Sequence, residues 1–547
     1  MMKKKSYVII YTLLILLIMS FFSYAEDNNI PDYILIGLKS GSSAVAMASL
    51  SSESGLVFGY RSDGGFVDLY DFGNVKKIYV RKDSYYNNFN DYFYEYNFDI
   101  NTDSSNSNII GPIHIQFNGS FSSKTEALAF INQISVFGVE PFLVLEDKWK
   151  VWVGTYTTYD AAEKSFNELR SLLPDVEMTV ISKNTSRIQV TDEKGKIMLI
   201  YNPAYGKYYF ESGDGNIPLA LDNKYFRGSI LFINAPNGNL TVINRLKMDE
   251  YLYGVLPKEM SYTAPAEALK AQAVAARNFA VVNKDKHEHE GFNLCATSNC
   301  QTYGGYSSEK PSTNKAVDDT SGMILTYNGD PISAYYHNHS GGHTEDCENV
   351  WGGSEGYLIG VEDNFGENYY WEVSLTKDNI SKSLLTAGYA PIGSITNIYE
   401  GSYSRTGSVL ELVVEGTEGS VILEKDNIRK VLGYNTIKSL KFNVGKENSV
   451  KVIGSNQNAM QDPKSLYIID GEGNISRLEN VKGHMYNGST YVQMKENSTS
   501  EEYFFSGRGY GHGIGMSQEG AVALSNLGYT FEEILYHYYT DVLLTKN

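Results

Sequence analysis

The alternation of hydrophobic and polar positions predicts a small α+β unit between residues 109 and 185. Apolar residues at every second position indicate half-buried strands, and apolar residues three or four apart indicate amphipathic helices. The predicted order is strand, helix, two strands, helix and strand, at residues 113–117, 124–137, 141–145, 150–153, 159–173 and 178–181. The residues expected to face inward on the two helices are Leu128, Ile131, Ile134, Ala162, Phe166 and Leu169. This βαββαβ order is that of a ferredoxin-like split unit.

Short strand patterns dominate the rest of the chain. Residues 26–108 are expected to form a small β-rich region that ends in a polar linker rich in Asn, Asp and Tyr. Residues 187–547 are expected to form a larger β-rich domain around one alanine-rich helix. The sequence thus predicts a mixed, multidomain protein of the α+β class.

The alanine-rich helix is predicted from Pro265 to Ala280. Pro265 suits a first helical turn, and Glu267 complements the positive end of the helix dipole. Ten of these sixteen residues are apolar and most are alanine, which lets neighbouring backbone approach closely, so we expect a buried helix.

Glu259 lies just before this helix, among aromatic and aliphatic residues. A carboxyl group in apolar surroundings has a raised pKa, which a general acid near neutral pH needs. The neighbouring Lys258 would lower that pKa if its ammonium faced the carboxylate. In an extended segment, however, adjacent side chains point to opposite faces. From these residues alone, the simpler interpretation is that Glu259 only complements the dipole of the helix that follows.

Glycine occupies every second position from Gly507 to Gly515. As a strand, this run would place all its glycines on one face and the side chains of Arg508, Tyr510, His512, Ile514 and Met516 on the other. A face without side chains allows close approach of a ligand or of another backbone, such as the alanine-rich helix.

Two helices are predicted after the glycine run. Ser517 is expected to cap a helix over 518–526, and Thr530 and Glu533 form a capping box that opens a last helix.

The net charge and the N-terminal residues limit the possible partners and the cellular compartment of the chain. The net charge of -18 argues against binding of nucleic acid, because the phosphate backbone requires a basic surface. Lys3–Lys5 precede an apolar run from Tyr7 to Phe22, and Ala25 offers a small residue for cleavage. Residues 1–25 are therefore predicted to be a signal peptide, with an uncleaved membrane anchor as the alternative. In both cases the rest of the chain is expected to be extracytoplasmic.

Taken together, these stretches resemble the stage II sporulation protein D family (SpoIID), which includes the amidase enhancer LytB. The resemblance is carried, in the family's order, by Leu240–Asn244, Tyr251–Val255, Glu259–Met260, Glu267–Arg277, Ser340–Glu345, Val350–Gly352 and Gly507–Gln518. Residues 109–185 are similar to the sporulation-related repeat (SPOR domain), through Gly119–Phe121 and Val153–Gly154. Such domains bind peptidoglycan glycan strands stripped of their stem peptides.

The resemblance implies a lytic transglycosylase that cleaves the MurNAc–GlcNAc bond of peptide-free glycan and leaves 1,6-anhydro-MurNAc. Glu259 falls on the catalytic glutamate of the family, which reverses the simpler interpretation of this residue. One carboxyl group suffices as acid and then base, and no metal is required for the chemistry. The candidate substrate-binding or supporting residues are Gln272, Ser340, Thr344, Glu345, Arg508, Tyr510, His512, Ser517 and Gln518.

The resemblance also bears on the cysteines. Cys295 and Cys300 have a spacing that fits a zinc clip. Some family members are similar in holding a structural zinc with two cysteines and a histidine. His289 is the nearest histidine, and His337, His339 and His343 are its rivals. A Cys295–Cys300 disulfide in an oxidising exterior is the alternative, which would leave Cys347 odd.

Two other functions remain open at this point. One is a non-catalytic protein that binds denuded glycan and activates a partner amidase. The other is a lysozyme-like hydrolase that uses a second carboxylate, with Glu345 as the candidate. The products distinguish the three functions, because they predict anhydro ends, no cleavage and reducing ends, respectively.

Overall fold

The computed structural model describes residues 30–89, 92–96, 109–446, 450–453, 458–461, 467–469, 475–477, 484–486, 491–493 and 501–546. The predicted signal peptide at residues 1–25 and much of the predicted linker lie outside these ranges. The chain divides into two compact units. One comprises residues 29–262 and 280–318, here called the N-terminal unit. The other, the C-terminal unit, contains residues 263–279 and 319–547.

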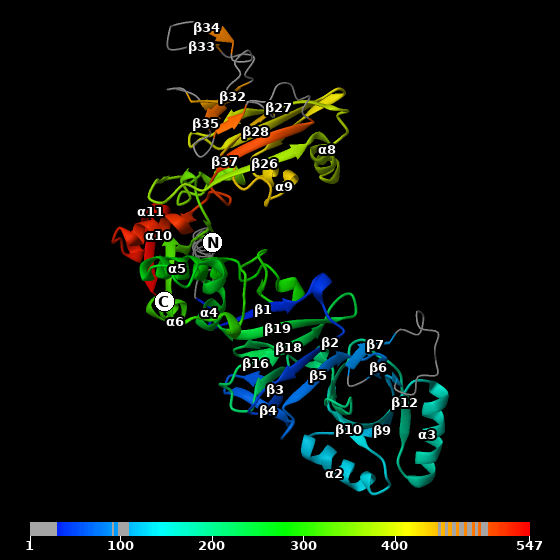
Figure 1. The fold of residues 1–547 in the computed structure, drawn as a ribbon. Coiled ribbons are helices and arrows are strands. Elements are labelled where there is room, and N and C mark those ends of the chain that lie inside the picture. The colour runs from blue at the N-terminus through cyan, green and yellow to red at the C-terminus, as the bar shows by residue number, and fades with distance from the viewer. Residues whose placement is uncertain are drawn as a thin grey trace, which may run out of the picture. The chain divides into compact units, whose positions relative to one another are not determined.

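The predicted βαββαβ order is present in the N-terminal unit (Figure 1). Its elements are β9 (Ile113–Phe121), α2 (Lys124–Ser135), β10 (Pro141–Leu145), β11 (Trp149–Tyr156), α3 (Tyr159–Leu172) and β12 (Met178–Ile181). The strands lie in the order β12-β9-β11-β10, and each neighbouring pair is antiparallel. The mixed α+β class is therefore confirmed.

The buried face of α2 agrees with the prediction at Ile134 and differs from it at Leu128. Leu128 is 40% exposed, whereas Ala127 and Ile134 are buried. Phe130 packs against Phe117 with ring centroids 5.7 Å apart, which fixes the rotation of the helix. The buried positions are therefore Ala127 and Ile134, and Phe130 and the predicted Ile131 are half-buried. On α3, Ala162 and Leu169 are buried as predicted, and Phe166 is only half-buried.

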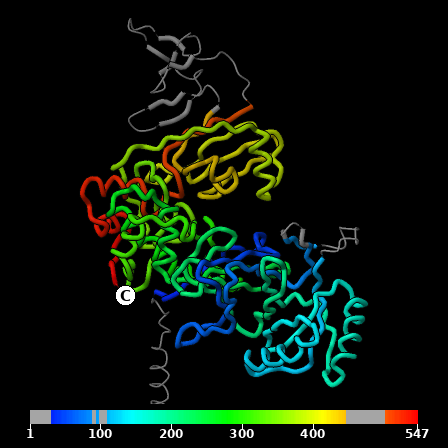
Figure 2. Tube along the Cα trace, turned by 60° about the horizontal axis from the view of Figure 1, so that its bottom comes forward, coloured from blue at the N-terminus to red at the C-terminus, as the bar shows by residue number. Residues whose placement is uncertain are grey.

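The sheets of the N-terminal unit cross the boundaries expected near residues 108 and 187. β10 continues through the parallel strand β14 (Ile197–Tyr201) into a ten-stranded sheet. Its other strands are β13 (Ile188–Thr191), β5 (Lys77–Lys82), β2 (Met47–Ser51), β16 (Leu219–Leu221) and β17 (Lys224–Phe226). Strands from residues 47–82 and from residues 188–226 thus share one sheet, as the blue and green segments side by side in Figures 1 and 2 illustrate.

A seven-stranded sheet carries the candidate site. Its strands, in spatial order, are β20 (Leu294–Cys295), β1 (Tyr33–Lys39), β19 (Leu240–Lys247), β18 (Ser229–Asn234), β15 (Tyr209–Ser212), β3 (Leu56–Ser62) and β4 (Gly65–Asp71). A third sheet consists of β7 (Tyr92–Glu95), β6 (Tyr86–Phe89) and β8 (Ile109–Ile110). Helix α4 (Met248–Glu259) follows β19 directly, and α6 spans Pro311–Asp319.

The C-terminal unit contains the first fourteen residues of α5 (Ala266–Val282). Leu269, Ala273 and Ala276 are almost fully buried, so the predicted buried helix is confirmed. The other helices are α7 (Cys347–Val350), α8 (Lys377–Thr386), α9 (Asn427–Leu432), α10 (Gln518–Asn526) and α11 (Phe531–Tyr538).

The strands of the C-terminal unit form several small sheets. The three-stranded sheets are β22 (Asp330–Pro331), β21 (Met323–Tyr327) and β39 (Leu543–Lys546); β26 (Tyr370–Thr376), β37 (Glu502–Arg508) and β30 (Phe442–Lys446); and β27 (Ile395–Tyr403), β28 (Val409–Gly416) and β29 (Gly419–Glu424). The two-stranded pairs are β23 (Tyr336–His337) with β38 (Met516–Ser517), β24 (Gly342–His343) with β25 (Glu362–Asp363), β31 (Val450–Ile453) with β32 (Asn458–Gln461), β33 (Tyr467–Ile469) with β34 (Ile475–Arg477), and β35 (His484–Tyr486) with β36 (Tyr491–Gln493).

The glycine run is not the predicted strand. β37 ends at Arg508, and Gly509, Gly511, Gly513 and Gly515 have φ of 88°, 121°, 84° and 67°. Residues with side chains rarely adopt this backbone conformation, so the alternation serves turns and close packing. A Cβ on Gly515, for example, would lie 2.1 Å from the backbone oxygen of Tyr335.

The two predicted helix caps are confirmed. Gly520 donates its backbone N–H to Ser517 Oγ at 3.1 Å, and Thr530 and Glu533 form the reciprocal capping box. Among the residues that the structure describes, none of the helices has the length and apolar character that crossing a membrane requires.

The buried Asn278 generates a prediction about stability. Its Nδ2 donates to the carbonyls of Leu325 and Ile332 at 2.7 and 3.1 Å, and its Oδ1 accepts from the Leu325 N–H at 2.8 Å. Asn278→Ala removes the acceptor of the buried Leu325 N–H, at about 1–3 kcal/mol, whereas the two carbonyls keep the Ile332 and Ala334 N–H donors at 3.1 and 3.0 Å. We expect a loss of about 2 kcal/mol in the free energy of unfolding, measured by chemical denaturation. The exposed Asn379→Ala on α8 is the control, and equal stabilities of the two variants would contradict the prediction.

Candidate functional site

Residues 248–259 form helix α4, which ends at Glu259. Tyr251, Leu252, Val255 and Leu256 are fully buried and form its inner face. The sequence-based expectation of an extended segment around Glu259 is therefore wrong. The Met260 N–H closes the helix on the Leu256 carbonyl at 3.0 Å, which leaves the Glu259 side chain at the last turn.

Glu259 has the surroundings that a general acid requires. Its Oε1 accepts a hydrogen bond from the Thr302 backbone N–H at 3.0 Å. Burial raises the pKa of Glu259, and the Thr302 bond lowers it by less, so the net shift is upward. Lys258 is exposed and Glu259 is partly buried, so the helix turns the two side chains into different surroundings.

The segment that presents Thr302 is anchored along α4 on both sides. Tyr251 Oη donates to Gln301 Oε1 at 3.2 Å, and the Gly304 N–H donates to the Gly254 carbonyl at 3.0 Å. The Tyr303 ring packs on the Tyr251 ring with centroids 5.3 Å apart, and a Cβ on Gly254 would lie 2.4 Å from the Tyr303 ring. Gly254 is thus the residue that admits this segment to the helix surface.

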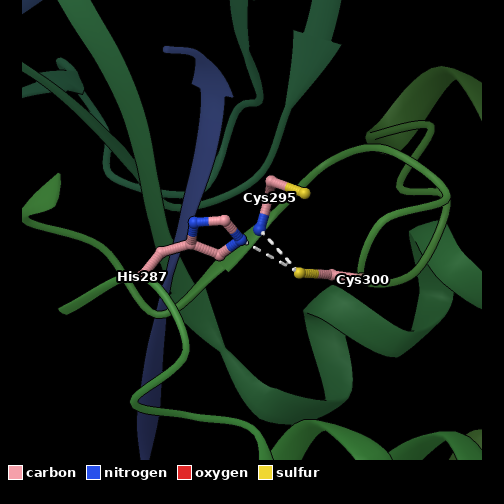
Figure 3. A group of neighbouring side chains, drawn as sticks. All are labelled: His287, Cys295 and Cys300. Atoms are coloured by element: carbon pink, nitrogen blue, oxygen red, sulfur yellow. Dashed lines mark hydrogen bonds between the residues drawn. The ribbon is translucent and has the colours of Figure 1, made fainter. Parts of the chain in front are cut away.

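His287, Cys295 and Cys300, here called the thiol cluster, lie immediately upstream of that segment (Figure 3). One potential ligand atom from each lies within 4.8 Å of the others, and His287 Nε2 is 3.4 Å from Cys300 Sγ. Two thiols and an imidazole are a donor set that suits zinc. The residues present therefore fit the structural metal that the resemblance implies.

The histidine of the cluster is not the predicted one. His289 has a side chain 77% exposed and is outside the cluster, whereas His287 stacks on Phe292 with centroids 5.0 Å apart. The turn Glu288–Glu290 with Gly291 at φ 88° brings His287 back to the strand β20. The rivals His337, His339 and His343 belong to the C-terminal unit.

Local pairing explains the position of the two thiols. Cys295 ends β20, which pairs in parallel with β1 through Gly37. The Cys295 N–H donates to Cys300 Sγ at 3.4 Å, and both cysteines are free thiols in this structure. Burial raises the pKa of Cys300 to about 11.

The other predicted site residues lie in the C-terminal unit, which we describe by itself. Gln272, Ser340, Thr344, Glu345 and Ser517 are buried. Gln518 Nε2 donates to Gln272 Oε1 at 3.2 Å, and Ser517 caps α10. In this arrangement these side chains support the fold, and Arg508 is the exposed member of the predicted set.

Glu345 is a structural anion rather than an acid. Burial pushes its pKa up, but hydrogen bonds from Ser408, Thr406, Asn349 and Ser404 outweigh burial and hold the pKa of Glu345 below its usual value. Ser404 Oγ donates to Oε2 at 2.7 Å, and Asn349 Nδ2 donates to Oε1 at 2.9 Å. The ionised carboxylate held in this way joins α7 to the loop 404–408, which follows β27.

His512 is held as a neutral imidazole. Desolvation and the nearby Arg429 lower the pKa of His512 to about 3. Its Nε2 lies 3.0 Å from the Tyr336 carbonyl, and its Nδ1 accepts from the Ile514 N–H at 3.0 Å. Both ring nitrogens are therefore used to fix the glycine-rich turns.

Comparison with known proteins places the site within a family. Residues 236–327 match the family model described as stage II sporulation protein (SpoIID), which includes Glu259 and the thiol cluster. Residues 357–474 match a domain of unknown function (DUF8618).

Individual relatives agree with this match. The chain is 33% identical over 331 residues to the amidase enhancer of Bacillus subtilis (strain 168), covering 60% of this chain and 45% of that protein. It therefore spans less than half the length of the amidase enhancer. The stage II sporulation protein D of Bacillus subtilis (strain 168) is 26% identical over 330 residues, covering 56% of this chain and 76% of that protein. The protein of that name from Bacillus amyloliquefaciens is also 26% identical, over 324 residues, with the same coverage. These matches show that the chain contains a SpoIID family domain at residues 236–327 and is similar to proteins named stage II sporulation protein D and amidase enhancer.

Proposed function

We propose that the chain is an exported lytic transglycosylase that cleaves MurNAc–GlcNAc bonds of peptide-free peptidoglycan strands and leaves 1,6-anhydro-MurNAc ends. The observation that carries this proposal is Glu259, a partly buried carboxyl group with a raised pKa at the end of α4. The SpoIID family domain and the relatives named above support a role in remodelling of the cell wall.

The chemistry requires one proton and no water. Protonated Glu259 donates its proton to the glycosidic oxygen, the bond from that oxygen to C1 of MurNAc breaks, and GlcNAc leaves with a free hydroxyl. The Glu259 carboxylate then takes the proton of the MurNAc 6-hydroxyl, whose oxygen bonds to C1 and closes the 1,6-anhydro ring. Glu259 ends protonated and ready for the next bond.

The Thr302 N–H has a defined part in this cycle. A bond to the charged carboxylate stabilises the ionised form that exists after the first proton transfer. Burial favours the protonated form that starts the cycle. The two effects oppose each other, which keeps both protonation states accessible to the same carboxyl group.

The structure also bears on the two alternatives. Glu345 is already engaged by hydroxyl and amide donors, which argues against its use as the second carboxylate of a lysozyme-like hydrolase. The amidase enhancer relative supports the other alternative, a non-catalytic protein that binds glycan and stimulates a partner amidase. Under that alternative Glu259 has no catalytic part.

We further propose that residues 109–185 are a SPOR-like module with a ferredoxin-like arrangement that contacts glycan. The antiparallel order β12-β9-β11-β10 supports this proposal. The face opposite α2 is partly closed, because Trp152 is buried and donates to Gln116 at 2.9 Å. A pocket of about 490 Å³, lined by residues 180–185 and Arg187, is an accessible place for a sugar beside β12.

A zinc ion held by His287, Cys295 and Cys300 would be structural, since it would cross-link the turn before β20 to the segment after it. Glu259 carries the proton in each step above, so the chemistry itself needs no metal.

The first prediction concerns Glu259→Gln. Gln has nearly the same shape and cannot carry the proton, so we expect formation of anhydro-MurNAc ends from purified denuded strands to fall at least about 100-fold. Mass spectrometry of the strand ends measures this. Glu250→Gln, at the other end of α4, is the matched control, because glutamine keeps the capping contact to the Lys247 N–H. Equal rates of the two variants would exclude Glu259 as the acid.

The pH dependence follows from the direction of the Glu259 pKa. The acid must be protonated in the free enzyme, so kcat/KM is expected to be flat at low pH and to fall about tenfold per pH unit above the pKa. Because burial raises this pKa, the fall is expected to begin above the 4.5 of an ordinary glutamate. Initial rates across a pH series test this, and a rate that rises with pH through the same range would show that the ionised form is the active one.

The thiol cluster predicts a metal content of about one zinc per chain, measured by elemental analysis after purification without chelators. Cys295→Ser and Cys300→Ser are expected to lose it. Cys347→Ser is the control, because Cys347 is buried at the start of α7 and belongs to the other unit. A zinc-free wild type with a Cys295–Cys300 disulfide would favour the redox alternative.

A further inference from the structure

We propose that Glu290 is a positioning residue: it orients His287 in the thiol cluster, and the closed cluster holds the Thr302 N–H against Glu259. This inference rests on the proposed function, since it assigns Glu290 a part in placing the proposed acid. Glu290 was not among the residues that sequence reasoning selected, because an acidic residue in a turn normally indicates only a solvated surface.

The contact between Glu290 and His287 sets the direction of the imidazole. Glu290 Oε1 lies 2.6 Å from His287 Nδ1, and both residues belong to the turn that ends at Gly291. With Nδ1–H donating to the carboxylate, Nε2 keeps its lone pair on the side of Cys300 Sγ, 3.4 Å away. A carboxylate behind a histidine in this way fixes its tautomer and increases its basicity toward a metal.

Phe292 stabilises the same orientation of the His287 ring by stacking on it. Its ring is stacked on His287 at an interplanar angle of 22°. Gly37 of β1 lies against that ring, and a Cβ there would come within 2.6 Å of it. The imidazole is therefore fixed by one polar and one apolar contact. Glu288 lies on the same turn but has no ion pair among the residues that the structure describes.

The cluster is joined to Glu259 by two residues of chain. After Cys300, Gln301 contacts Tyr251 of α4, and Thr302 donates its backbone N–H to Glu259 at 3.0 Å. The segment is also held by the Tyr303 N–H, which donates to the Ala296 carbonyl at 3.1 Å. Opening the cluster therefore removes the anchor that lies two residues before Thr302 and leaves those at Gln301 and Tyr303.

The consequence concerns the Thr302 amide specifically. With Cys300 held by the cluster, the chain direction at Gln301 is fixed and the N–H of Thr302 points at the carboxyl group. With Cys300 released, the Thr302 N–H is expected to exchange faster with solvent, and its hydrogen bond to the carboxylate, which favours the charged form, is weakened. A metal held by the cluster would thus influence Glu259 through the Thr302 backbone hydrogen bond, without contacting the carboxyl group.

The test compares Glu290→Gln with Glu288→Gln on the same turn, both as the full exported chain. Zinc affinity is measured by competition with a colorimetric chelator. Glu290→Gln is expected to bind zinc about 10–100-fold more weakly, and Glu288→Gln to equal the wild type. Glu290→Asp, which keeps the carboxylate on a shorter side chain, is expected to lie between them. Equal zinc affinity of the Gln variants would overturn the positioning role.

The second measurement is amide hydrogen exchange across residues 300–304 at limiting and at saturating free zinc. Glu290→Gln is expected to exchange faster than Glu288→Gln at limiting zinc and to match it at saturation, where circular dichroism confirms the same fold. Unchanged exchange despite lost zinc would overturn the link to Thr302. If the chain cleaves glycan, the pH at which kcat/KM begins to fall is expected to be higher at limiting zinc in Glu290→Gln, and to be unchanged in Glu288→Gln. Zinc affinity and exchange need no glycan cleavage, so a failure of the proposed reaction is distinguishable from a failure of this inference.

Discussion

The hydrogen bond from the Thr302 N–H to the Glu259 carboxyl group is the contact on which the candidate site depends. It joins two stretches that are 43 residues apart in the chain, and it exists only because Gly254 lets the 301–304 segment lie on α4. Burial alone would disfavour the ionised form of Glu259 and make the carboxyl group a weaker acid. With the backbone donor, the same carboxyl group can lose a proton to a leaving oxygen and recover one from a hydroxyl.

The surroundings of the two candidate carboxyl groups differ in the way that separates an acid from a structural anion. Glu259 has its pKa raised, with burial as the dominant cause. Glu345 is also buried, but side-chain donors from Ser404, Thr406, Ser408 and Asn349 outweigh the burial and keep it ionised. The pKa of the same chemical group is thus raised or lowered according to the hydrogen-bond donors around it.

Much of the fold could be predicted from periodicity, and the errors have physical causes. The βαββαβ order, the alanine-rich helix and both helix caps depend on local spacing, and all of them are present. The helix α4 is not evident from the sequence because Pro257 lies inside it, where proline has no N–H to donate to the carbonyl four residues earlier. The glycine run has a strand's period, but its four positive φ angles serve turns. The pairing of β1 with β19 could not be read from local sequence at all, because strands from distant parts of the chain meet there.

The residues of the candidate site also differ in how far the sequence predicts them. Glu259, Cys295 and Cys300 stand out by residue type and by family resemblance. The choice of His287 over His289 depends on a turn at Gly291, which spacing alone does not fix. Thr302 acts through its backbone, so no side-chain signal marks it, and Glu290 resembles any exposed acid until its partner is known. The predicted substrate contacts Ser340, Thr344 and Ser517 have buried side chains, which accept hydrogen bonds from the backbone N–H groups of Gly342, Val361 and Gly520.

The central claim is that cleavage proceeds by internal attack of a sugar hydroxyl and without water. The most direct measurement is digestion of denuded glycan strands in water enriched in oxygen-18, followed by mass spectrometry of the new MurNAc ends. Ends that are lighter by one water than a reducing end and that contain no oxygen-18 are the predicted result. Reducing ends labelled with oxygen-18 would show hydrolysis and contradict the account.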